Sequence, residues 1–142
     1  MSDNFFLKEI EDIAGKDAKA KELSPLVLAY VGDSVFELIV RTYVVYEGTR
    51  HVKELNIISD KMVNAKAQID LYNAVKDMFT DEEAAVYRRG RNAKISSSAK
   101  NATLADYKRA TGLEALFGYL YLSDNVSRAM ELFKAGMENL KE

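Results

Sequence analysis

The sequence predicts an all-α fold in a single domain, on three observations. The 142 residues contain one proline and seven glycines, so few breaks interrupt the chain. Apolar residues recur every three or four positions along most of its length, the pattern of helices with a buried face. No stretch shows the strict alternation of a half-buried strand. We therefore expect one helical domain over residues 1–142, with its core in residues 22–140.

The N-terminal third predicts a short helix and then a long one. Residues 5–13 are amphipathic and are expected to lie on the core as a lid, and a polar, lysine-rich connector follows at 15–20. Ser24 suits the capping position of a helix and Pro25 its first turn. The long helix should then continue to Gly48, which suits a C-terminal cap.

The middle of the chain contains two or three further helices. Residues 49–78 lack glycine and proline, and they predict either one helix or two joined near Ser59 and Asp60. Thr80, followed by three acids, has the features of a capping box. The helix that it begins should end between residues 88 and 90.

A polar loop separates this part from the C-terminal helices. Residues 91–103 are basic and rich in serine, and we expect them to form a flexible loop, which in a compact domain is functional or disordered. Residues 104–122 return to a buried helical pattern, in which Gly112 and Gly118 indicate close contacts with other helices. A final amphipathic helix should end near Leu140.

Composition excludes several classes of protein. Without cysteine there is neither a disulfide framework nor a thiolate metal site. The N-terminus lacks the basic and apolar regions of a secretory signal. The apolar run 26–46 is interrupted by Asp33, Glu37 and Arg41, so we do not expect it to span a membrane. A cytoplasmic protein with no membrane association is the expectation.

The charge is unevenly distributed. From Arg88 to Arg109 there are seven basic residues and one acid, a net charge of +6 in a chain whose total is −2. Such a segment concentrates a field that attracts phosphate groups. The arginines could alternatively do no more than interact with the dipole of a solvated helix end.

Two apolar helical segments each contain an embedded acid. Asp33 lies within the apolar run 26–46, and Glu114 is the only charged residue between Thr111 and Leu122. If the two helices pack together, the carboxylates can face each other across a buried interface, where their repulsion favours a hard divalent cation such as Mg²⁺ or Mn²⁺. Taken singly, each acid could instead be a structural group hydrogen-bonded to a neighbouring helix.

Two nearby polar side chains have simpler interpretations. Glu37, one turn after Asp33, could be a further ligand, but an ion pair with Arg41 four residues later is favoured. Thr111 is better explained as a contact on a helix face than as a ligand.

Three segments, in this order along the chain, carry a family resemblance. Residues 28–38 (LAYVGDSVFEL) resemble the signature helix of the ribonuclease III catalytic domain, and residues 111–122 (TGLEALFGYLYL) resemble its second metal-binding helix. Residues 88–94 (RRGRNAK), with the Lys100 and Tyr107 regions that follow, are similar to the Mini-ribonuclease III branch, which has no separate domain for binding double-stranded RNA. The resemblance covers most of the chain.

The resemblance implies a homodimeric helical endonuclease domain that hydrolyses double-stranded RNA. It implies Mg²⁺ as cofactor, replaceable by Mn²⁺, with metal-activated water attack that leaves 5′-phosphate and 3′-hydroxyl ends. In the Mini branch the implied substrate is precursor 23S ribosomal RNA, and a ribosomal protein on that substrate is a possible partner. Asp33 and Glu114 are the implied catalytic and metal-binding residues, and Ser34 could hold a metal-bound water or a hydrogen bond to a ligand.

The resemblance also concerns the basic segment, which we expect to contact RNA in place of the missing domain. The candidate RNA-binding residues are Arg88, Arg89, Arg91, Asn92, Lys94 and Lys100.

The chain departs from the larger family at three positions. Ala29, Leu26 and Thr111 stand where that family has further acids. These losses support the alternative of a non-catalytic RNA-binding or ribosome-associated protein with the same fold. A structural helical dimerisation module is a weaker third option, because it leaves the basic segment unexplained.

Overall fold

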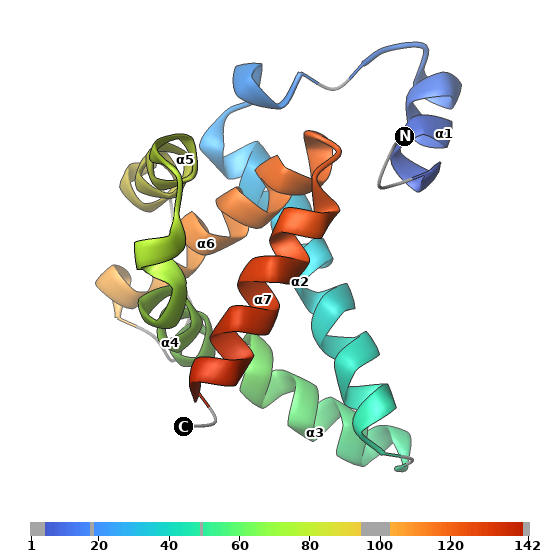
Figure 1. Ribbon diagram of the computed structural model, residues 1–142, viewed down its shortest axis with the longest axis vertical. Coiled ribbons are helices and arrows are strands. Elements are labelled where there is room, and N and C mark those ends of the chain that lie inside the picture. Colours follow the sequence, from blue (N-terminus) through green and yellow to red (C-terminus); the bar gives the residue numbers. More distant parts are fainter. Residues whose placement is uncertain (1–4, 18, 49, 95–102, 141–142) are drawn as a thin grey trace.

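The computed structural model describes residues 5–17, 19–48, 50–94 and 103–140, which form helices and contain no strand (Figure 1). The helices are α1 (Phe5–Ala14), α2 (Pro25–Glu47), α3 (Val52–Val63), α4 (Ala65–Val75), α5 (Asp81–Asn92), α6 (Leu104–Leu122) and α7 (Val126–Leu140), with short 3-10 turns at Ala20–Glu22 and Lys76–Met78. The predicted all-α fold is confirmed.

Helix α6 is the centre of the bundle. It packs against α2, α4, α5 and α7, and nearly every side chain from residue 110 to residue 120 is buried. Phe117 lies on this helix with no exposed surface, and the ring of Phe36 from α2 meets it edge-to-face at 5.3 Å between centroids. Phe133 from α7 meets the ring of Phe36 in the same manner, at 6.2 Å. The apolar α6 predicted from sequence is therefore the helix around which the others assemble.

Two glycines allow α2 and α6 to touch through their backbones. A Cβ atom on Gly118 would lie 1.9 Å from the carbonyl oxygen of Leu28, and one on Gly32 would lie 1.6 Å from that of Glu114. No side chain larger than hydrogen fits at either position. The close contact expected at Gly118 is confirmed, and the crossing sets Asp33, the residue after Gly32, beside Glu114.

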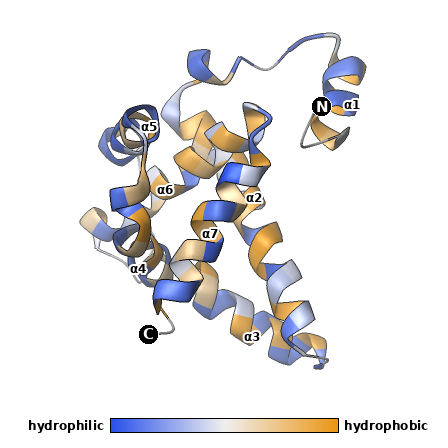
Figure 2. Cartoon of the chain, viewed as in Figure 1, coloured by the Kyte–Doolittle hydropathy of each residue, from blue (hydrophilic) through white to orange (hydrophobic). Residues whose placement is uncertain are grey.

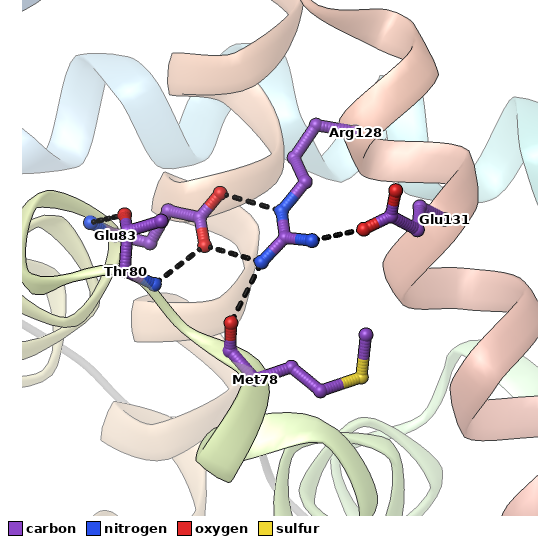
Figure 3. A network of polar contacts seen from close by, with 5 residues as sticks. All are labelled: Met78, Thr80, Glu83, Arg128 and Glu131. Atoms are coloured by element: carbon purple, nitrogen blue, oxygen red, sulfur yellow. Dashed lines mark hydrogen bonds and ion pairs between the residues drawn. The ribbon is translucent and has the colours of Figure 1, made fainter.

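A buried ion pair joins α5 to α7. Arg128 donates to both carboxylate oxygens of Glu83 at 2.9 Å, to the backbone carbonyl of Met78 at 2.7 Å, and to Glu131 (Figure 3). Glu83 also accepts from the backbone N–H of Thr80 in the predicted capping box. This network fixes the first turn of α5 against α7.

Two expectations about the boundaries of the helices were wrong, and one expected loop lies largely outside the described residues. The break in residues 49–78 falls at Asn64, whose side chain caps α4 by accepting from the N–H of Ala67, and not near Ser59. Helix α5 continues to Asn92, because Gly90 does not end it but packs against α6. Of the loop expected at 91–103, residues 95–102 lie outside the described residues.

Helix α1 forms as predicted but does not act as a lid on the core. Leu7 is buried, whereas Phe6, Ile10 and Ile13 are exposed, and α1 lies at the edge of the molecule (Figure 1).

Helix α2 leaves part of its apolar surface uncovered. The hydropathy colouring shows apolar residues on its outer side (Figure 2), and Tyr30 and Tyr46 are at least 80% exposed. Leu26, Val27 and Leu38 are exposed as well. Among the helices of the described residues, none combines the length and hydropathy needed to cross a bilayer.

Candidate active site at the crossing of α2 and α6

The structure brings the two predicted carboxylates together. Asp33 follows the crossing glycine of α2, and Glu114 lies on the facing turn of α6. Their carboxyl groups are close enough to share a hydrogen bond. Two motifs that are far apart in the sequence therefore contribute their acids to a single site.

Glu114 has the perturbed carboxyl group of the pair. Burial, and next the negative charge of Asp33, raise the pKa of Glu114 to about 8, while a hydrogen bond from Gln68 acts in the opposite direction. At neutral pH the metal-free site therefore retains a proton on Glu114. At neutral pH a positive charge placed between the two carboxylates would favour the ionised form of both.

Asp33 is not buried, contrary to the sequence-based expectation. In the single chain the side chain of Asp33 is exposed, as is that of Ser34. Asp33, Ser34 and Glu114 instead line an open cavity of about 300 Å³, together with Leu26, Ala29, Tyr30, Tyr107 and Thr111. The carboxyl pair is thus accessible to a ligand as large as a phosphate group.

The alternatives for Glu37 and Thr111 are settled by their contacts. Arg41 donates to Glu37 at 2.6 and 3.1 Å, so Glu37 forms the expected ion pair. The Thr111 hydroxyl donates to the backbone carbonyl of Tyr107 at 2.9 Å, the expected contact on a helix face.

Within the described residues, no group of three or more His, Asp or Glu side chains could share one metal ion. The site has two carboxylates, as the departures from the larger family indicate.

The described residues of the basic cluster (Arg88, Arg89, Arg91, Asn92 and Lys94) lie on or directly after α5, which packs against the same part of α6. Gly90 of α5 packs against α6 between Thr111 and Ala115, the turn that contains Glu114. The arginines on either side of Gly90 therefore lie on the helix that packs against this turn of α6.

Most side chains of the basic cluster that the structure describes are exposed. Arg88, Arg89, Asn92 and Lys94 are exposed, and Lys100 lies outside the described residues. Arg91 is half-buried, with its guanidinium 5.9 Å from the centre of the Tyr87 ring and its Nε donating to Asn92. Arg88 and Arg89 are thus the arginines most available to a ligand.

Sequence reasoning missed Gln68, a side chain of α4 that contacts the site. Its amide nitrogen donates to Glu114 Oε2 at 3.2 Å, and the side chain is buried. The available signal was its position: Gln68, Leu71 and Val75 share one face of a helix, and a polar residue on an otherwise buried face requires a partner.

Comparisons with known proteins identify the family of this chain. The family model for the ribonuclease III domain matches residues 26–125, which include both carboxylates and the basic cluster. Mini-ribonuclease 3 of Enterococcus faecalis is 44% identical over 114 residues, covering 79% of this chain and 86% of that protein. Mini-ribonuclease 3 of Clostridium tetani is 41% identical, covering 80% and 76%.

A solved structure shares the fold. The crystal structure of protein FN1578 from Fusobacterium nucleatum superposes with a TM-score of 0.76 at 29% identity, covering 82% of this chain and 96% of that one. The matched residues, the identity to several relatives and the shared fold show that this chain belongs to the ribonuclease III family, in its Mini-ribonuclease 3 branch.

Proposed function

We propose that the protein is a Mg²⁺-dependent endonuclease for double-stranded RNA whose active site is the carboxyl pair of Asp33 and Glu114. Membership of the ribonuclease III family makes it an endoribonuclease. The observation that carries the proposed site is the meeting of these two acids in an open cavity beside a basic helix end.

The residues of the site fit a hard divalent cation. Carboxylate oxygens are the ligands that Mg²⁺ and Mn²⁺ prefer, and at neutral pH a compensating positive charge would favour full ionisation of the pair. Asp33 and Glu114 would hold the ion from α2 and α6, and RNA phosphate and solvent oxygens would complete its coordination. When bound, a divalent ion makes water more acidic and stabilises negative charge on a reacting phosphate.

The other residues of the cavity orient the substrate and the carboxylates. Glu114 carries a proton at neutral pH in the free site and must release it on loading, and Gln68 donates to its ionised form. The hydroxyl of Ser34 is exposed at the cavity and can hydrogen-bond to a solvent molecule or a phosphate oxygen.

The basic cluster is the proposed RNA contact. Arg88, Arg89, Arg91, Asn92 and Lys94 lie on either side of Gly90, through which α5 packs on α6, and Lys100 extends the same segment in sequence. Duplex RNA presents phosphates and 2′-hydroxyls across a wide minor groove, so contacts of this kind recognise shape rather than sequence. Guanidinium groups suit such phosphate contacts because they donate two parallel hydrogen bonds.

A homodimer is part of the proposal. The outer side of α2 exposes Leu26, Val27 and Tyr30 beside the carboxyl pair, an apolar surface that a second copy would cover. Asp33 lies next to this surface, so a partner there would also reduce the exposure of the site.

The finer substrate assignment rests on the resemblance to the Mini branch. We propose precursor 23S ribosomal RNA as the substrate, with products that carry 5′-phosphate and 3′-hydroxyl ends. The single catalytic domain proposed for residues 1–142 would perform both RNA binding and cleavage.

One gel tests the proposal against its alternative. Labelled duplex RNA is incubated with the protein in Mg²⁺ or in chelator, with duplex DNA of the same sequence as a control. Cleavage only of RNA and only with Mg²⁺ supports the endonuclease, whereas binding without cleavage in all conditions supports a non-catalytic RNA-binding protein. Asp33→Asn should abolish cleavage and leave RNA binding and the unfolding temperature within experimental error of the wild type.

A further inference from the structure

Gln68 occupies a position where a polar side chain is unusual. It is 3% exposed and lies on the face of α4 that contains Leu71 and Val75, which are 3% and 1% exposed. A buried amide must pair its donors within the protein, because an unmade hydrogen bond there is more costly than in water. The partners of Gln68 therefore show what the side chain does.

Both amide hydrogens of Gln68 are used, and they connect two different elements. Nε2 donates to the backbone carbonyl of Val63 at 2.9 Å and to Glu114 Oε2 at 3.2 Å. Val63 is the last residue of α3, and the N–H that would continue the helix, that of Ala67, donates to the Asn64 side chain instead. Gln68 thus donates a hydrogen bond to the free carbonyl at the C-terminal end of α3 and, at the same time, to a carboxylate oxygen of Glu114 on α6.

The orientation of the amide is determined by these partners. The Val63 carbonyl can only accept a hydrogen bond, so a reversed amide would set two acceptors against each other. In the observed orientation Gln68 Oε1 is buried and has no hydrogen-bond partner among the described residues. The side chain therefore presents a donor, and not an acceptor, to Glu114.

We propose that Gln68 is a positioning residue that holds the Glu114 carboxylate toward Asp33, in the orientation in which the two bind a divalent cation. The inference rests on the proposed function. Gln68 Nε2 has no free lone pair and cannot itself be a ligand. Its hydrogen bond stabilises the charged carboxylate and restricts it to one rotamer, while Oε1 of Glu114 receives no bond from the amide.

A purely structural role makes a different prediction. If Gln68 only connects α4 to α6, its loss will lower the stability of the fold and leave metal binding unchanged. Val75→Ala provides the matched control, because Val75 lies on the same face of α4, is similarly buried, and packs in the hydrophobic core.

The test compares Gln68→Met, which keeps the length of the side chain and removes both donors, with the wild type and Val75→Ala. Mn²⁺ affinity is measured from the electron paramagnetic resonance signal of free Mn²⁺, and the Mg²⁺ concentration for half-maximal RNA cleavage is measured in parallel. We expect Gln68→Met to raise both the Mn²⁺ dissociation constant and the Mg²⁺ concentration for half-maximal cleavage about 10- to 100-fold. This is the usual effect of removing a hydrogen bond to a metal ligand. RNA binding in chelator should be unchanged, and Val75→Ala should lower the unfolding temperature without moving either midpoint.

Midpoints for Gln68→Met within twofold of the wild type would overturn the inference. If Gln68→Met does not fold, Gln68→Asn replaces it, since an amide one methylene shorter cannot reach both Val63 and Glu114, and the same shift is expected. A wild type that neither binds Mn²⁺ nor cleaves RNA would overturn the proposed function itself, and this inference with it.

Discussion

The Cα of Gly32 faces the backbone carbonyl of Glu114 so closely that a methyl group there would lie 1.6 Å from the oxygen. The residue preceding one candidate ligand is therefore in backbone contact with the other. This contact therefore fixes how closely the backbones that carry Asp33 and Glu114 approach each other.

The first prediction concerns the glycines of this crossing. Gly118→Ala should destabilise the protein by at least the 1–3 kcal/mol typical of an overpacked core, because its Cβ would lie 1.9 Å from the Leu28 carbonyl oxygen and the helices must separate. Gly48→Ala is the control, since the atom nearest to its Cβ among the described residues would belong to the flexible Arg50 side chain, at 3.4 Å. The midpoints of urea unfolding are compared for Gly118→Ala and Gly48→Ala. Equal midpoints would contradict the close backbone contact of α2 and α6 at Gly118.

The second prediction is a pH dependence in the absence of metal. The pKa of Glu114 rises on folding from 4.5 to about 8, so the folded protein binds more protons than the unfolded chain between those values. Stability present below pH 4.5 is therefore lost as the pH rises through 8. In chelator, Glu114→Gln should gain stability relative to the wild type from pH 5 to 8 and no more above that. A difference that does not vary with pH would argue against the shared proton.

The third prediction concerns the ion pair of Glu83 and Arg128. Burial alone would raise the pKa of Glu83, but hydrogen bonds from Arg128 and Thr80 outweigh it and the pKa lies below its usual value. Arg128→Met should destabilise the fold by about 3–5 kcal/mol, because it leaves a buried carboxylate unpaired. Removing the exposed pair partner in Lys66→Met should change stability by less than about 1 kcal/mol. Thermal unfolding at pH 7 compares them, and the Glu83 contribution should disappear as the pH falls below 4.5.

The fourth prediction concerns RNA affinity. Replacing Arg88 and Arg89 with alanine should weaken binding of duplex RNA and make its dependence on salt shallower by about one logarithmic unit per lost phosphate contact. The paired control is Lys53→Ala with Lys61→Ala, on α3, which packs against α2 and α4. Filter binding between 50 and 300 mM salt, in chelator, measures both slopes. An unchanged slope in the arginine variant would mean that Arg88 and Arg89 interact only with the dipole of the helix end and do not contact RNA.

The fifth prediction concerns the outer side of α2. Tyr30 is 80% exposed in the single chain, and a carboxylate at this position would oppose burial against a second copy. Tyr30→Asp should shift the protein from dimer to monomer in sedimentation, with little change in helix content. Ile13→Asp, at an equally exposed position on α1, should leave the dimer intact. A wild type that sediments as a monomer at all concentrations would contradict the proposed homodimer.

Much of the fold follows from local rules. The N-cap at Ser24, the capping box at Thr80 and the apolar pattern of residues 104–122 predict helices that the structure contains. The acid within each apolar run predicts a site because a helical core rarely contains an unpaired carboxylate. These features depend on a few neighbouring residues, so the sequence alone displays them.

The remaining features depend on tertiary contacts. Gly90 has the sequence character of a helix end, but its lack of a side chain allows α5 to approach α6, and the helix continues through it. The exposure of Asp33 depends on which helices cover α2, and the role of Gln68 depends on how α4 meets α6. Neither arrangement can be read from the periodicity of one segment.

The carboxyl pair joins helices from opposite halves of the chain, so no local segment of the unfolded polypeptide can assemble it. A cation held by that pair would bind the native state alone and would shift the folding equilibrium in its favour by mass action. A bound magnesium ion would then protect the enzyme from proteolysis as well as support its activity. Removal of the ion would therefore lower the amount of folded protein.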